Sequence, residues 1–306
     1  MARVVVIGAG VVGLSCAVRL LEAGHQAAVV ARDLPLETTS ATAPGLFYPH
    51  RAYPFERVTG WAATTFHELV RLAAEDRTGV RVVPGVEVHR VPTPQPWWAS
   101  AVPRLERPTH VPAGYAAGWA LDAPVAEMPV YLTWLAARVE ELGGTVTRMA
   151  LSGIPDGADV VVDAAGLGAR LFADDGSVVP VRSHALRLEQ VGLERWVVDP
   201  VGPVYVVPRG RDVVVAGTDE EGRWDRTPDD ATAKELLERA RGLVPELRRA
   251  KVLAHRVGLA PARPAVRLEE VAGPAGNRVV HCYGHGGAGV TLSWGCADEV
   301  AALVAR

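Results

Sequence analysis

A glycine motif near the N-terminus fixes much of what this chain can fold into. An apolar run that follows Arg3 leads into the hexapeptide Gly8-Ala9-Gly10-Val11-Val12-Gly13, and a helix-like stretch and a second apolar run follow. In such a unit Gly8 makes the tight turn, Gly10 admits a pyrophosphate to the backbone, and Gly13 lets the helix pack on the strand. The positive end of the helix faces the phosphates. The pattern predicts a Rossmann-like βαβ unit that binds a dinucleotide.

This motif leaves the identity of the dinucleotide open. An acidic residue usually ends the second strand and binds a ribose hydroxyl, but here Ala31 and Arg32 precede Asp33. An arginine at this point is also compatible with a 2′-phosphate and hence with NADP. The hydroxyl-rich run Thr38-Thr39-Ser40 is suited to donate hydrogen bonds to a pyrophosphate, although an ordinary surface linker has the same composition.

A second glycine-rich segment lies near the C-terminus, at Tyr283-Gly284-His285-Gly286-Gly287-Ala288-Gly289. It follows a strand-like run and precedes a helix-like one. Because glycine has no Cβ, a planar ring can lie flat against such a backbone, and the N-terminus of the next helix favours an oxygen with negative charge. A flavin ring would suit this cradle; the alternative is a tight strand-to-helix turn without a ligand.

Composition and charge narrow the functional class. The chain has 306 residues, of which 49% are hydrophobic, so it can bury a large core in about two domains. A net charge of -3 gives no electrostatic footprint for nucleic acid or an anionic membrane, and no uncharged run reaches the ~20 residues of a membrane span. We read no signal peptide. The cysteines, Cys16, Cys282 and Cys296, are too scattered in sequence for a metal site or a disulfide framework, so we expect no metal and a reducing cytoplasm.

The candidate cofactor segments are interleaved with the rest of the chain. They lie near residues 8, 40, 166 and 287, so one domain must be assembled from separated pieces. We expect an α/β fold with a Rossmann-like cofactor-binding domain from residues 1–50, 131–175 and 264–306. An inserted α+β substrate domain with a mostly antiparallel sheet is expected from residues 51–130 and 176–263. Within it, Val80 to Val91 alternates around Pro84-Gly85 and predicts a hairpin.

At this point the residues carry a resemblance that runs nearly from end to end. The first glycine motif, Thr38-Thr39-Ser40, Gly45-Leu46-Phe47-Tyr48-Pro49, Tyr205-Val206-Val207-Pro208 and Gly-His-Gly-Gly at 284–287 together resemble the D-amino-acid oxidase family of flavoproteins. The resemblance implies noncovalently bound FAD rather than NADP. It further implies that Gly289, Val290 and Thr291 lie near the pyrimidine end of the flavin, that Gly45 and Leu46 line one ring face, and that Ala150 and Gly166 touch the adenosine and diphosphate side. The chain ends Ala302-Leu303-Val304-Ala305-Arg306, without the peroxisomal tail of eukaryotic members, which again favours the cytoplasm.

The family removes the α-hydrogen of an amino acid as hydride to flavin N5 and passes the electrons to O2, giving an imine that hydrolyses to a 2-oxo acid. Because the cofactor carries the difficult step, protein groups need only hold the substrate. The resemblance implies that the hydroxyl of Tyr205 binds the substrate carboxylate and that the carbonyl of Gly287 receives the substrate amine. As alternatives, Tyr205 is a core tyrosine and Gly287 a turn glycine. The partners expected are thus an amino acid or amine and O2; the sequence leaves the oligomeric state open, a homodimer included.

One departure from the family pattern concerns substrate binding. The family's Arg-Pro-x-Arg-Pro segment has a first arginine that pairs with the substrate carboxylate, and here that position is Ala260 in Gly258-Leu259-Ala260-Pro261-Ala262-Arg263-Pro264. A desolvated carboxylate without its partner costs about 3–5 kcal/mol. The family's Arg-Gly-Gln also reads Arg182-Ser183-His184 here. We therefore expect a retuned pocket in which His184 or Arg263 is a candidate to bind the carboxylate.

Three interpretations follow. The first is a D-amino-acid oxidase with altered carboxylate recognition. The second is a related flavin oxidase of an amine, an N-substituted amino acid or a larger biosynthetic intermediate. The third is a flavin-binding protein that has lost its chemistry.

Overall fold

The parallel strands at one end of the sheet form the predicted dinucleotide-binding fold. In sheet order they are β5 (Thr145–Arg148), β2 (Gln26–Ala31), β1 (Arg3–Ile7), β6 (Val160–Asp163) and β13 (Arg278–His285). Ranked along the chain, this is the third, second, first, fourth and fifth strand, the order of a Rossmann-type sheet. The crossover from β1 to β2 is α1 (Val11–Glu22), as the glycine motif predicts. The computed structural model describes all residues from Met1 to Arg306.

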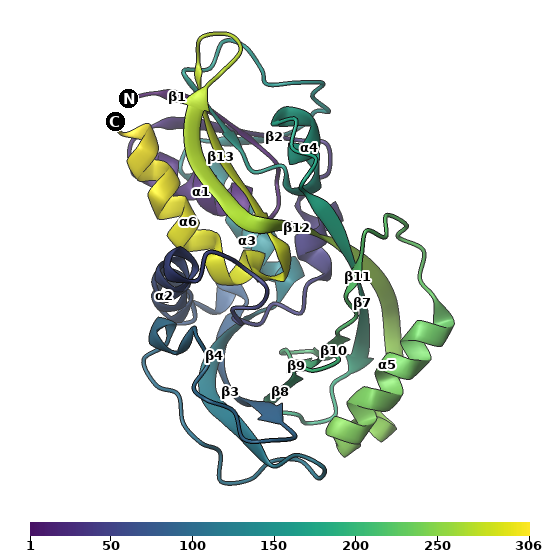
Figure 1. Cartoon of the computed structure of the whole chain (residues 1–306). Helices are drawn as coiled ribbons and strands as arrows, with labels where there is room; N and C mark the ends of the chain where they lie inside the picture. Colours follow the sequence, from purple (N-terminus) through teal and green to yellow (C-terminus); the bar gives the residue numbers. More distant parts are fainter.

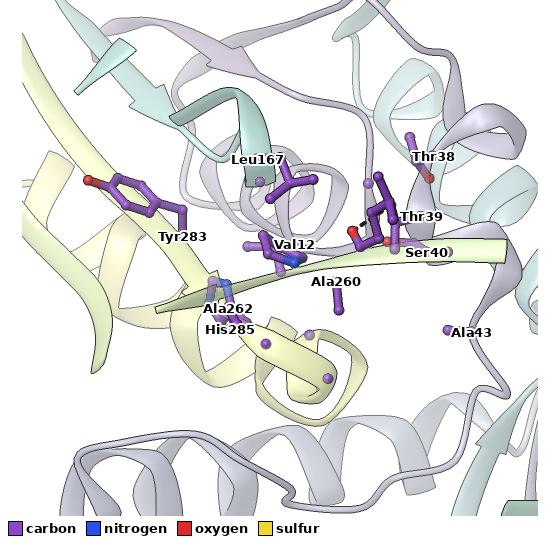
Figure 2. A pocket seen from close by; sticks show the side chains of 18 of the residues that line it. Val12, Thr38, Thr39, Ser40, Ala43, Leu167, Ala260, Ala262, Tyr283 and His285 are labelled. Atoms are coloured by element: carbon purple, nitrogen blue, oxygen red, sulfur yellow. Dashed lines mark hydrogen bonds between the residues drawn. The ribbon is translucent and has the colours of Figure 1, made fainter. Parts of the chain in front are cut away.

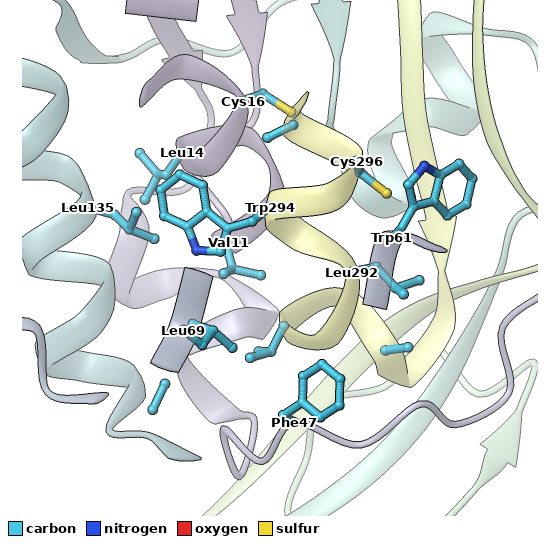
Figure 3. Close-up of a cluster of buried hydrophobic side chains, with 14 of the residues drawn as sticks. Val11, Leu14, Cys16, Phe47, Trp61, Leu69, Leu135, Leu292, Trp294 and Cys296 are labelled. Carbon is cyan, nitrogen blue, oxygen red and sulfur yellow. The ribbon is translucent and has the colours of Figure 1, made fainter. Parts of the chain in front are cut away.

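Four helices pack together beside this parallel region (Figure 1): α1, α2 (Phe55–Leu72), α3 (Met128–Glu141) and α6 (Gly289–Val304). Figure 3 shows the Trp294 indole of α6 among Val11, Leu14 and Leu135. The buried indole nitrogen donates to the Tyr131 hydroxyl of α3 at 2.7 Å, so its polar end is satisfied within the apolar layer. The main core therefore lies between these helices and the sheet.

The opposite end of the sheet is mostly antiparallel, as expected. Its order is β4 (Ala117–Ala126), β3 (Val80–His89), β8 (Trp196–Asp199), β9 (Val204–Pro208), β10 (Asp212–Ala216) and β7 (Val179–Glu189); only β3 and β8 pair in parallel. The short β11 (Glu220–Glu221) also pairs with β7. Helix α5 (Asp230–Leu243) covers β7, β9 and β10, and the Asp229 side chain caps it by accepting from the Thr232 N–H at 2.8 Å.

One long strand, β12 (Val252–Ala272), joins the two regions into a single 13-stranded sheet (Figure 1). It pairs with β7 from Val252 to Ala262 and with β13 from Ala262 to Ala272, with a register shift after Ala262. The strand thus changes partner near the middle of its length. The domain boundaries expected from the sequence stay a prediction, because one sheet connects the two regions.

The remaining elements are short. They are α4 (Ala169–Phe172) and the 3₁₀ segments η1 (Pro35–Glu37), η2 (Thr39–Thr42), η3 (Asp76–Thr78), η4 (Ala99–Ala101), η5 (Gly166–Gly168), η6 (Pro245–Arg249) and η7 (Gly286–Ala288). None of the helices combines the length and the apolar character that crossing a bilayer requires.

The hairpin expected around Pro84-Gly85 is wrong. Residues 80–89 form the uninterrupted strand β3, which pairs with β4 along its whole length. Gly85 serves packing rather than a turn: a Cβ there would lie 2.1 Å from Cδ2 of Trp196, whose indole is fully buried. The Trp196 indole nitrogen also donates to the Val83 carbonyl at 3.0 Å. The Trp196 side chain on the neighbouring strand therefore explains the glycine, and the sequence around Gly85 gives no sign of this contact.

Replacing Gly85 by Ala should destabilise the protein by about 1–3 kcal/mol, because the added methyl overlaps the Trp196 ring. The urea midpoint of unfolding should fall. Gly153→Ala is the matched control, since a Cβ at Gly153 meets nothing within 4 Å. Equal midpoints for the two variants would contradict the packing role of Gly85.

Candidate active site

A cavity of about 790 Å³ lies where β12 changes partner. Figure 2 shows the strand that carries Ala260 and Ala262 crossing this pocket close to Val12, Thr39 and Ser40. The wall is built from segments far apart in sequence, as the interleaved motifs predict. Of the residues expected at the cofactor, these border it: Gly8, Ala9, Gly10, Val11, Val12, Ala31, Arg32, Thr38, Thr39, Ser40, Leu46, Ala150, Gly166, Gly286, Gly287, Gly289 and Val290.

The first βα turn has the tight packing that its glycines predict. A Cβ at Gly8 would lie 2.5 Å from the Ala164 carbonyl oxygen, and Gly8 has a positive φ of 110°. Gly13 does not line the cavity; a Cβ there would lie 2.0 Å from the Gly8 carbonyl oxygen. Gly13 therefore acts by letting α1 approach β1, and the start of α1 is left open toward the cavity.

The hydroxyl-rich loop is bound to the protein more than expected. Thr38 donates to the Pro35 carbonyl at 2.7 Å, and Thr39 donates to the Leu259 carbonyl of β12 at 3.0 Å. Only Ser40 keeps its proton free, because its Oγ accepts from the Val11 N–H at 3.1 Å. Within this run, the Ser40 hydroxyl and backbone N–H groups are the donors that can face a pyrophosphate.

At the end of β2, Arg32 is already paired. Its guanidinium lies 2.6 Å from Asp33, and this contact holds the pKa of the Asp33 carboxyl below its usual range. The positive charge that suggested a 2′-phosphate is therefore balanced within the protein. Asp33, one position beyond Arg32, borders the cavity too, so an acidic side chain is present near the end of β2.

Two residues expected at the flavin ring, Gly45 and Thr291, do not border the cavity and instead contact residues of its wall or the adjacent strand β4. Gly45 does not border the cavity, since a Cβ there would lie 1.9 Å from the Ala126 carbonyl oxygen of β4. Thr291 is also outside the lining; its Oγ1 accepts from the Tyr48 N–H at 2.9 Å and lies 3.1 Å from the Tyr48 carbonyl, to which it donates. These contacts hold the neighbouring Leu46 against the cavity.

The glycine cradle fits a planar ring. Gly286 and Gly287 are the first two residues of η7, and Gly289 begins α6, whose first N–H groups have no intrahelical partner. All three glycines border the cavity, and a Cβ at Gly287 would have no neighbour closer than 3.9 Å. The three glycines place no side chain against the cavity, which suits a flat ring, and the N-terminus of α6 favours a ring that carries carbonyl oxygens.

The substrate-binding candidates divide into two groups. Tyr205, Gly287, Ala260 and Arg263 border the cavity, and His184 does not. Burial raises the pKa of the Tyr205 hydroxyl well above its usual range, so the group remains a donor at neutral pH. The Tyr205 ring lies edge-on to the ring of Tyr48, at 5.8 Å between centroids.

Neither residue expected to replace the missing arginine is free to do so. His184 is fully buried, its Nδ1 lies 2.8 Å from Nε2 of His255, and burial lowers its pKa. Arg263 donates to the Asp175 carboxylate at 2.8 Å and to the Ala265 carbonyl at 2.9 Å. The position of His184 does not support a ligand contact, and the guanidinium of Arg263 is committed within the protein.

Sequence reasoning missed a polar group beside Tyr205. His50, Arg51 and Asp219 border the cavity, and Arg51 lies 2.9 Å from the Asp219 carboxylate. The neighbouring His50 and Arg51 hold the pKa of the Asp219 carboxyl below its usual range. His50 and Arg51 directly follow the Gly45–Pro49 motif, which is the signal that could have revealed them; Asp219 lies in a loop without any motif.

The cysteines are less scattered than their spacing suggests. Sγ of Cys282, Sγ of Cys296 and a ring nitrogen of His285 lie within 4.8 Å of one another, all buried. The reason is that α6 folds back over β13, bringing residues fourteen positions apart together. The argument from sequence spacing is therefore wrong, because these groups meet in the folded chain, and the expectation of no metal stays a prediction. All three cysteines are free thiols.

Comparison with known proteins gives a consistent result. Residues 3–303 match the DAO family model, described as FAD dependent oxidoreductase. A D-amino-acid oxidase of Rubrobacter xylanophilus is 51% identical, over 99% of this chain and 96% of that protein. A D-amino-acid oxidase of Streptomyces coelicolor is 40% identical, over 98% of this chain and 96% of that protein.

The fold is also found among solved structures. The crystal structure of glycine oxidase from Geobacillus kaustophilus superposes with a TM-score of 0.84 at 20% identity, covering 100% of this chain and 95% of that one. This superposition shows that the chain has the fold of that structure. The family match and the cavity's fit to a dinucleotide and a planar ring agree with it. The protein belongs to the FAD-dependent oxidoreductases of the D-amino-acid oxidase family, and its cofactor is FAD.

Proposed function

We propose that this protein is an oxidase of D-amino acids, converting D-amino acid, O2 and water into 2-oxo acid, ammonia and hydrogen peroxide. The observation that carries the proposal is that Tyr205 and the Gly286-Gly287 backbone border the same cavity as the phosphate-binding turn. A substrate held there lies beside the ring cradle. Similarity to D-amino-acid oxidases over nearly the full length supports the choice of substrate class.

We assign the cofactor contacts to the cavity-lining glycines, Ser40 and Asp33. Bound FAD supplies the acceptor for the α-hydrogen and passes the electrons to O2. The protein's part is to place the substrate: the Tyr205 hydroxyl donates to its carboxylate, and the Gly287 carbonyl accepts from its amine. The apolar wall next to these groups, which includes Leu46, Val181 and Ala260, excludes water from the reacting carbon.

Ala260 favours one competing function. A cavity without a fixed cation at this position suits an amine, or an N-substituted amino acid, as well as a simple D-amino acid. From composition and charge we also propose a cytoplasmic protein without nucleic-acid or membrane partners. The domain boundaries and the oligomeric state, a homodimer included, remain predictions from the sequence.

The purified protein should be yellow and should release FAD, not NADP, on denaturation, because the phosphate-binding turn and the ring cradle both border the cavity. Chromatography of the released cofactor and the visible absorption spectrum make the measurement. A colourless protein that does not take up added FAD would sink the assignment.

Replacing Tyr205 by Phe should raise KM for D-amino acids at least tenfold, about 1.4 kcal/mol, with little change in flavin content. The ring is retained, so its edge-on contact with Tyr48 persists and only the hydroxyl is lost. Steady-state peroxide assays and the ratio of flavin to protein absorbance test this. If flavin is lost and KM is unchanged, Tyr205 supports the fold and does not bind substrate.

Replacing Ala260 by Arg should raise kcat/KM for simple neutral D-amino acids at least tenfold, about 1.4 kcal/mol of recovered interaction, with flavin binding unchanged. Peroxide production with D-alanine, D-methionine and a primary amine of similar size makes the comparison. A loss of activity with all three substrates, or a gain with the amine alone, would contradict carboxylate recognition at this point.

A further inference from the structure

The missing cation at Ala260 raises the question of which group binds a carboxylate in this cavity. Four arginines border it: Arg32, Arg51, Arg226 and Arg263. Three of them are in ion pairs within the protein: Arg32 with Asp33, Arg51 with Asp219 and Arg263 with Asp175. The charge of Arg226 acts on Asp33 at the end of β2. Of the four, Arg51 is the one associated with the ring cradle and Tyr205.

Backbone contacts place Arg51 at the substrate end. The Arg51 carbonyl oxygen lies 3.2 Å from the point where a Cβ of Gly286 would be. The ring of the preceding residue, His50, approaches Gly287 in the same way, at 3.9 Å, and lies edge-on to Tyr205 at 6.1 Å between centroids. The segment that carries Arg51 therefore touches both groups to which we assign substrate contacts.

The conformation of Arg51 points to function as well. Its φ is 50°, in the left-handed region that a long side chain rarely adopts without compensation. The turn directs the chain past Gly286, and the guanidinium contacts Asp219 at 2.9 Å and Glu221 at 3.8 Å. The Arg51 side chain borders the cavity and keeps 46% of its surface exposed, and its guanidinium has more N–H donors than the Asp219 contact uses.

His50 adds a second polar group at this place. Its Nε2 is buried and has no hydrogen-bond partner, and the nearest carboxylate oxygen, on Asp219, lies at 3.7 Å. A buried nitrogen without a partner is costly unless a ligand completes it. Arg51 and His50 thus offer two polar groups near Tyr205 that the protein itself does not use fully.

We propose that Arg51 binds the substrate carboxylate in place of an arginine at position 260, and that Asp219 orients Arg51 and competes with the substrate for it. The ligand class is a small carboxylic acid or amino acid. This inference rests on the proposed function only in assuming that the substrate carries a carboxylate. Asp219 acts through Arg51 and is a positioning residue.

Propionate and its uncharged analogue propionamide are the probes, titrated calorimetrically into the FAD-loaded protein. Arg51→Asn removes the charge and tolerates a positive φ, and we expect it to weaken propionate binding at least tenfold. Asp219→Asn removes the competing anion, and we expect it to tighten propionate binding several-fold. Propionamide should bind the three forms alike. Arg104→Gln, which removes an exposed ion pair with Glu106 outside the cavity, should match the unaltered protein.

The opposite signs distinguish recognition from a structural ion pair. If the Arg51–Asp219 pair only stabilises the loop, both variants weaken binding, and the proposal is overturned. It is overturned equally if Arg51→Asn leaves propionate binding unchanged. Should Arg51→Asn fail to retain FAD, Asp219→Asn alone decides the matter, because weaker propionate binding in that variant contradicts competition for Arg51.

A double variant and a peroxide assay complete the design. Adding Ala260→Arg to Arg51→Asn should restore propionate binding, since it returns a cation to the same cavity; no recovery would count against a shared ligand. Peroxide release from D-alanine by the unaltered protein tests the proposed function separately. Oxidation of D-alanine with unaffected propionate binding in Arg51→Asn defeats this inference alone, and the reverse outcome defeats the proposed function alone.

Discussion

The partner exchange of strand β12 is the constraint on which the rest of the structure depends. The strand pairs with β7 up to Ala262 and with β13 beyond it, so the parallel and antiparallel regions share one backbone. Where a strand leaves one neighbour for another, a crevice opens beside it, as at the switch points of other α/β sheets. The residues at the exchange, from Gly258 to Pro264, all border the cavity. The fold therefore brings the first βα turn and residues of the antiparallel region to the same cavity.

Features dictated by the backbone could be predicted from the sequence. The βαβ unit was predictable because three glycines have three distinct steric tasks, and the packing of Gly8 and Gly13 agrees with them. The antiparallel region was predictable as a class, but not its pairing, since the partner of a strand is set by residues distant in sequence. The hairpin prediction at Gly85 was wrong for this reason. The glycine is required by packing against Trp196, which lies more than a hundred residues away in the sequence, so no local pattern could indicate the contact.

The part of the candidate site that is built from backbone and small residues was predictable from the sequence. The pairing of its charged side chains was much less predictable. Most of the glycines and small residues expected at the cofactor border the cavity, because their expected role depends on the backbone and needs no side-chain partner. Their contacts with the cofactor stay a prediction. The roles of Arg263 and His184 depend on Asp175 and His255, which lie in other segments and occupy their polar atoms. Arg51 and Asp219 were missed for the converse reason, since each is unremarkable until the fold brings them within 2.9 Å beside Gly286. The charge available to a ligand in this cavity thus depends on which side chains are paired in the folded protein. The effect of Ala260 on carboxylate binding depends on these other charged groups as well.

The central claim is that the cavity at the β12 exchange holds FAD and a D-amino acid in reacting positions. Anaerobic mixing of the FAD-loaded protein with D-alanine or L-alanine, each at high concentration, tests it most directly. The visible absorbance of the flavin reports electron transfer without dependence on O2. We expect D-alanine to bleach the flavin and L-alanine to leave it oxidised. Flavin that stays oxidised with every D-amino acid tried, or that is bleached equally by both enantiomers of alanine, would contradict the claim.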